Sequence, residues 1–154
     1  MGTKHVLNLD LDDEPLHIIA IHSDLEDYQL VYWINVTLGL QLRREQDDLE
    51  FAQRVFAPWY VFDYEIEFSR YVLLPNQLEQ QLSEISDQDL FSAQYTKAYY
   101  VLPEFKKADY LLKFEGLYEE DLTEILNKLK GLPEIVMAYA LNSQQIKSRT
   151  NLIF

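Results

Sequence analysis

The chain opens with two segments whose pattern of apolar and polar residues is that of strands. Residues 5–11 alternate between the two classes, as in a half-exposed strand. An acidic turn follows at 12–15, and residues 16–22 are then apolar on both faces, which is typical of a more central strand. We predict that the two segments form a hairpin.

A helix is predicted to begin directly after Ser23. Ser23 and Glu26 have the spacing of a capping box, in which each side chain accepts a hydrogen bond from the other residue's backbone amide. The apolar pattern continues to Leu38, and Gly39 stands where helices commonly end in a left-handed residue. Because the apolar residues spread around much of this helix, we expect it to be covered on more than one side.

The middle of the chain has a less regular pattern. Residues 40–51 predict a short edge strand with loops, and residues 59–74 predict either one bent strand or a hairpin that turns near Ser69. The stretch 76–95 is the most polar of the chain. We predict a mobile loop there, with one weak helical turn.

The last third predicts a strand, a helix and a second strand. Residues 108–115 alternate, and residues 118–129 carry apolar side chains at helical spacing before Gly131 ends the helix. Residues 135–141 are almost continuously apolar, which is typical of an inner strand. This order predicts a βαβ unit with a right-handed crossover.

Together these elements predict an α+β fold. We expect a two-layer sandwich with a mostly antiparallel sheet and two main helices on one face. The specific arrangement we expect is a ferredoxin-like plait with extra strands. A length of 154 residues fits a single domain spanning 1–154.

Composition removes several classes of function. The net charge is −13, from 26 acidic and 13 basic residues, and such a field repels nucleic acid. The chain has no cysteine, which excludes disulfides and thiolate chemistry. Its start lacks the pattern of a signal peptide and no apolar run has the length of a membrane span, so we expect a cytoplasmic protein with no membrane partner.

A short signature follows the polar stretch. Leu102-Pro103-Glu104 and, after three residues, Ala108-Asp109-Tyr110 resemble the motif of the IPExxxVDY family, an uncharacterised bacterial family, with Leu and Ala in place of Ile and Val. Segments 7–11, 28–40 and 71–76 are also similar, so the resemblance covers nearly the whole chain. It implies a single bacterial cytoplasmic domain and brings no activity, cofactor or catalytic residue.

The residues of the signature have a structural interpretation of their own. Pro103 ends a strand or begins a helical turn, and Glu104 can accept the free amides of that turn. We expect Asp109 to bind a neighbouring turn or helix end, and Tyr110 to bury its ring while its hydroxyl reaches a partner, for which Asn35 is one hypothesis. The alternative is that Glu104 and Asp109 act as an acid–base pair.

Other candidate chemistry is weaker. The acidic residues at 10–14 lack the spacing of a calcium loop, so a solvated turn is expected. His17 and His22 would face opposite sides of a strand, although His5 could meet His22 across the hairpin. With four glycines the chain has neither a phosphate-binding loop nor a nucleophile elbow. We therefore predict no catalytic residue, no metal site and no cofactor.

These observations favour a non-enzymatic module that binds a protein partner or itself, and a homodimer is the expected assembly. The aromatic residues expected to form its interaction surface are Tyr28, Trp33, Trp59 and Tyr60. The first alternative is a regulatory domain that binds a small ligand. The second is a hydrolase that uses carboxylates and a metal ion, and an enzyme is the less favoured class.

Overall fold

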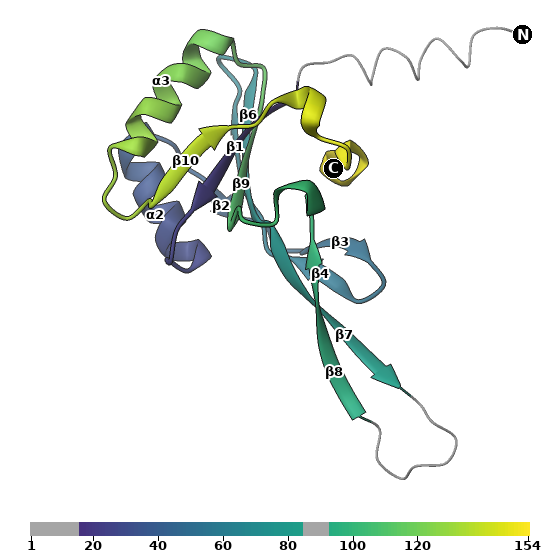
Figure 1. The fold of residues 1–154 in the computed structure, drawn as a ribbon. Coiled ribbons are helices and arrows are strands. Elements are labelled where there is room, and N and C mark those ends of the chain that lie inside the picture. The colour runs from purple at the N-terminus through teal and green to yellow at the C-terminus, as the bar shows by residue number, and fades with distance from the viewer. Residues whose placement is uncertain (1–15, 85–92) are drawn as a thin grey trace, which may run out of the picture.

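A computed structural model describes residues 16–84 and 93–154 (Figure 1). The strand expected at 5–11, its hairpin with 16–22, the acidic cluster at 10–14 and His5 lie outside these residues or depend on residues outside them.

The centre of the fold is a six-stranded antiparallel sheet in the order β10-β1-β9-β6-β5-β2. Two helices, α2 and α3, accompany it, so the predicted α+β class with a mostly antiparallel sheet is confirmed. The bounds are β1 (His17–His22), α2 (Asp27–Leu38), β2 (Arg43–Arg44), β5 (Tyr60–Tyr64), β6 (Ser69–Pro75), β9 (Tyr110–Glu115), α3 (Glu119–Lys130) and β10 (Met137–Ala140).

Four of these strands and the two helices have the connections of a ferredoxin-like plait. β1 lies between β10 and β9 and is antiparallel to both, so β9 and β10 run parallel without being neighbours. In the same way β9 separates β1 from β6. Both helices lie on one face of the sheet (Figure 1), and β5 and β2 are extra strands beyond β6.

The helix-covered face holds one of two apolar cores. Strand residues such as Ile19, Ile21 and Leu112 pack there with Leu30 and Ile34 of α2. Leu129 of α3 is also fully buried in this core. Alternate residues of the same strands point to the other face, which must therefore be covered as well.

The second face is covered by irregular and short elements. They are the hairpin of β3 (Leu49–Ala52) and β4 (Val55–Ala57), and two C-terminal 3₁₀ turns, η2 (Ser143–Gln145) and η3 (Arg149–Leu152). Ile146 and Leu152 from these turns pack on the sheet. The central strand β9 is consequently buried on both faces along most of its length.

The region 59–74 is a hairpin, which decides between the two alternatives. β5 and β6 pair with each other, and the chain turns at 65–68. The turn places Phe68 in a left-handed conformation, with φ of 52°.

The prediction of a mobile loop at 76–95 is wrong for the residues that the structure describes. Residues Gln77–Glu84 form β7 and pair with β8 (Ala93–Tyr100), and residues between them lie outside the description. Leu78 and Leu82 are four apart, a spacing that fits a helical turn as well as one face of a strand. The partners that favour the strand, Tyr99 and Tyr95, come from a segment more than ten residues away.

Two further predictions need correction. Ser23 is not the helix cap, since its hydroxyl donates to the Glu134 carbonyl at 2.8 Å, and Glu26 with Gln29 forms the capping box instead. The last strand, β10, is an edge strand rather than an inner one. Its apolar character arises because it has neighbours on both faces.

Lys113 is a buried charge that holds the C-terminal turns on the sheet. Its Nζ donates to the Leu152 carbonyl at 2.7 Å, lies 2.8 Å from a Glu115 carboxylate oxygen and stands 4.6 Å from the centre of the Phe154 ring. We expect Lys113→Met to lower the free energy of unfolding by about 2 kcal/mol, because the Leu152 carbonyl loses a charged donor.

Urea denaturation measures this effect, and Lys128→Met is the matched control. The Lys128–Glu124 pair is exposed, so its loss should leave the stability close to that of the native chain. Equal effects of the two substitutions would contradict the assignment.

Candidate interaction site

The signature segment folds around one buried amide that the sequence did not single out. The Asn76 side chain donates to the Phe105 carbonyl at 2.9 Å and to the Ala108 carbonyl at 3.1 Å, and accepts from the Leu102 amide at 2.8 Å. Its backbone adds bonds to Val101 and Asp109. The loop between β8 and β9 is therefore fixed by Asn76. Its only local signal was a polar residue directly after an apolar strand.

Glu104 joins the signature to the C-terminal turns. Pro103 begins a 3₁₀ turn, η1 (Pro103–Phe105), and the Glu104 carboxylate accepts from the Ser148 amide. Burial raises the pKa of this carboxyl, but hydrogen bonds from its own amide and from Ser148 outweigh burial and leave the pKa below its ordinary value. The charged form of Glu104 thus stabilises the contact between two segments.

Asp109 and Tyr110 hold the passage from β1 to α2. The Ser23 amide donates to Asp109 Oδ2 at 3.0 Å, and the Tyr110 hydroxyl donates to the Leu25 carbonyl at 2.6 Å. The hypothesis that Asn35 is the partner of Tyr110 is wrong, because Asn35 exchanges two hydrogen bonds with the backbone of Leu42.

The contacts of the two signature carboxylates argue against an acid–base pair. Glu104 binds backbone at 148, whereas Asp109 binds the amide of Ser23. Each carboxylate holds a different segment of backbone, and no hydrogen bond among the described residues joins the two. Glu104 and Asp109, together with Pro103 and Tyr110, therefore connect segments that are distant in the sequence.

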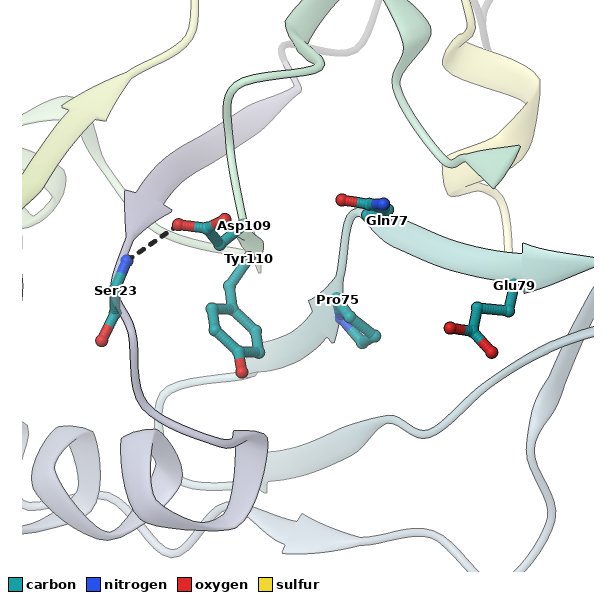
Figure 2. Close-up of a pocket in the computed structure, with 6 residues that line it drawn as sticks. All are labelled: Ser23, Pro75, Gln77, Glu79, Asp109 and Tyr110. Carbon is teal, nitrogen blue, oxygen red and sulfur yellow. Dashed lines mark hydrogen bonds between the residues drawn. The ribbon is translucent and has the colours of Figure 1, made fainter. Parts of the chain in front are cut away.

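A cavity of about 260 Å³ opens beside Asp109 and Tyr110 (Figure 2). In that view Asp109 points toward Ser23, while Glu79 extends from the opposite side of the hollow. The carboxylates of Asp109 and Glu79 therefore do not converge in this cavity. The lining residues are Ser23, Pro75, Gln77, Glu79, Asp109 and Tyr110.

Residues 16–84 and 93–154 contain neither a cluster of metal ligands nor a membrane-spanning helix. No group of three or more His, Asp or Glu side chains there could hold a metal ion. His22 instead lies 3.2 Å from the Tyr139 hydroxyl. Within the same residues, no helix has the length and apolar character needed to cross a bilayer.

The four aromatic residues predicted to form one interaction surface differ in burial and in their contacts. Tyr28 lies on the outer face of α2 and is 63% exposed, and Trp33 on the same helix is half-buried with its ring against Tyr32. Trp59 packs edge-on against Phe154 and donates to the Asp47 carbonyl. Tyr60 is buried in the helix-side core. The outer face of α2 is exposed in the single chain, and the expectation that another segment or a subunit covers it stays a prediction.

The ribbon formed by β7 and β8 is a surface that the sequence did not reveal. It projects from the body of the protein (Figure 1). At its base Leu78 is buried in the second core and Tyr99 packs against Phe51. Farther out Leu82 stands opposite Tyr95, which is 45% exposed.

The ribbon carries a small net charge for part of an acidic protein, since two Glu and one Lys sum to −1. Of its sixteen residues only Glu79, Glu84 and Lys97 are charged. The whole chain has 39 charged residues in 154.

Comparison with protein-family models, curated proteins and solved structures finds no match to the chain. Membership of the IPExxxVDY family therefore stays a prediction, and function is argued from the surfaces of the protein.

Replacement of Asn76 should be among the most damaging single changes. Asn76→Ala leaves the Leu102 amide and the carbonyls of Phe105 and Ala108 without partners in a buried site, so we expect a loss of about 3 kcal/mol in the free energy of unfolding. Asn142→Ala is the control, since Asn142 caps an exposed turn and should cost about 1 kcal/mol. A loss at Asn76 no larger than at Asn142 would contradict the role of the buried amide.

Tyr110 gives a pH-dependent prediction. Burial, followed by the nearby charges of Asp27 and Glu26, raises the pKa of Tyr110 to about 12 from its ordinary 10.0. Below pH 10 the Tyr110 hydroxyl is protonated in both the folded and the unfolded state. There the free energy of unfolding of the native chain should exceed that of Tyr110→Phe by about 1 kcal/mol. Above pH 10 the unfolded state ionises first, so this advantage is lost as the pH rises toward 12.

Urea denaturation of both chains between about pH 8 and 12 tests the prediction. A stability difference that stays constant over this range would show that the Tyr110 hydroxyl is not held in its protonated form by the fold.

Proposed function

We propose that the protein is a non-enzymatic interaction module that associates with a second copy of itself through the β7–β8 ribbon. The observation that carries the proposal is the projecting ribbon with its partly exposed apolar pair, Leu82 and Tyr95. Three physical arguments support it.

The first argument is stability. A two-stranded ribbon is marginally stable in water unless a third strand or another layer covers it. The described contacts of the ribbon with the body are at its base, through Leu78, Tyr99 and the bond from Gln80 to the Gln53 carbonyl at 3.1 Å. A second copy placed over Leu82 and Tyr95 would supply the missing layer.

The second argument is hydrogen bonding. β7 and β8 form a sheet of their own with two strands, so among the described residues the outer edge of β8 pairs with no other strand. An open edge presents unpaired amides and carbonyls to a partner. Two β8 edges can pair antiparallel about a two-fold axis, because each copy then offers the same surface to the other.

The third argument is charge. Two chains that each carry −13 repel each other over most of their surfaces. A contact between copies is least unfavourable where the net charge is small, and the sixteen ribbon residues carry a net charge of −1, from two Glu and one Lys. The signature carboxylates favour the same class of function, since Glu104 and Asp109 are engaged by backbone amides rather than presented to a substrate.

Sedimentation velocity of the double variant Leu82→Glu with Tyr95→Glu tests the proposal. We expect the native chain to be a dimer and the variant to dissociate at concentrations at least about tenfold higher than the native chain, because two carboxylates would be buried without partners. Raising the ionic strength should strengthen the native dimer, since salt screens repulsion between acidic chains.

The matched control is Tyr28→Glu, which adds the same charge on the exposed face of α2. It should leave the dimer intact. A native chain that is monomeric at its highest soluble concentration, or a dimer that Tyr28→Glu breaks and the ribbon variant does not, would overturn the assignment to the ribbon.

A further inference from the structure

A second cavity lies on the helix side of the sheet, away from the ribbon. It measures about 310 Å³ and lies between the C-terminal end of α2, the helix α3 and the turn between β5 and β6. The apolar residues that line it are buried or half-buried and are called its floor, and the charged residues that line it are exposed and are called its rim. The floor residues are Leu38, Leu40, Tyr71, Leu117 and Ile125, and the rim residues are Glu67, Asp121, Glu124 and Lys128.

The two segments around this cavity are strongly acidic. Residues 65–69 and 115–127 contain seven of the 26 acidic residues and neither Lys nor Arg. The single cation on the rim, Lys128, forms an ion pair with Glu124 at 2.9 Å. Glu67 and Asp121 therefore leave the rim with a net negative charge.

The same two segments expose three large apolar side chains. Phe68 is 90% exposed, Tyr118 80% and Ile66 79%, which are the highest values for large apolar residues in the described part of the chain. The segments lie against each other, because a Cβ added to Gly116 would come within 2.3 Å of the Phe68 carbonyl oxygen. Exposed apolar groups and carboxylates thus occupy one continuous surface.

The backbone of Phe68 adds an independent observation. Its φ of 52° is unfavourable for a bulky residue, and Gly or Asn would adopt this conformation at a lower cost. The Phe68 ring contributes little to the stability of the fold, since it is almost fully exposed. Strained residues cluster at ligand-contacting and switch sites, so Phe68 is a candidate contact residue in addition to the exposed surface around it.

We propose that this cavity and its rim bind a basic, amphipathic segment of a partner protein. An apolar side chain of the partner enters the cavity, and its Lys or Arg side chains lie over Glu67 and Asp121. A second copy of this chain is a poor occupant, because its net charge of −13 has the same sign as the rim. The cavity is at the lower limit for small-ligand pockets, and the three exposed apolar residues extend the surface beyond it.

The site stands independently of self-association through the ribbon. The double variant Leu82→Glu with Tyr95→Glu should therefore bind the partner segment as the native chain does. Loss of the dimer in that variant would leave this proposal untouched.

The experiment uses a fluorescent synthetic helix with Leu and Lys at amphipathic spacing, followed by anisotropy. Two matched peptides separate the contributions: one with Ser in place of Leu, the other with Glu in place of Lys. We expect the Leu–Lys peptide to bind and each matched peptide to lose at least about tenfold in affinity. Added salt should weaken this binding, the opposite of its effect on the dimer.

Phe68→Gly is the decisive variant because it separates binding from stability. It removes the ring and also the backbone strain, so the urea midpoint should rise while peptide affinity falls about tenfold. Glu67→Gln should also weaken binding. Phe56→Ser and Glu50→Gln remove an exposed aromatic ring and an exposed carboxylate on the β3–β4 hairpin, and should leave affinity unchanged.

Three results would overturn the proposal. The first is equal binding of the Leu–Lys and Ser–Lys peptides, and the second is unchanged affinity in Phe68→Gly. The third is saturable binding of phenethylammonium alone, as strong as that of the peptide and equally dependent on Phe68, which would make the cavity a site for small amines.

Discussion

The buried amide of Asn76 is the interaction on which the arrangement of this protein depends. Up to Pro75 the chain pairs with β9, and from Gln77 it pairs with β8. Asn76 stands at this change of partner and closes it with bonds from its side chain and backbone to the loop between those two strands. Because the site is buried, an unpaired group there would be costly, so the amide admits one geometry of the loop.

The fixed loop then positions the rest of the signature. Glu104 at one end of the loop holds the C-terminal turns against the second face of the sheet. Asp109 and Tyr110 at the other end hold the start of α2. The direction in which the ribbon leaves the body is set at the same point, since β7 begins at the residue after Asn76. The signature, for which an acid–base pair was the alternative interpretation, thus connects the sheet, the helix α2 and the ribbon.

The two proposed contact surfaces differ in charge. The ribbon has a net charge of only −1 and suits a second copy, whereas the cavity beside Phe68 concentrates carboxylates and suits a basic partner. Salt acts on them in opposite directions, because it screens repulsion in the first case and attraction in the second. In both proposals the net charge of −13 decides which kind of partner fits the surface.

The sequence by itself determined the elements whose burial follows a local period. The strand near Tyr110, the helix over 119–130 and the α+β class follow from alternation and helical spacing, which depend on neighbours within a few residues. The tertiary structure decided the rest: the ribbon, the edge position of β10, the bonds of Ser23, and the different burial of Tyr28 and Tyr60. The reason is that strand partners and buried hydrogen bonds, such as those of Asn76, come from distant parts of the chain. A local pattern shows that a residue is buried or polar, but the residue that faces it is set when the chain folds.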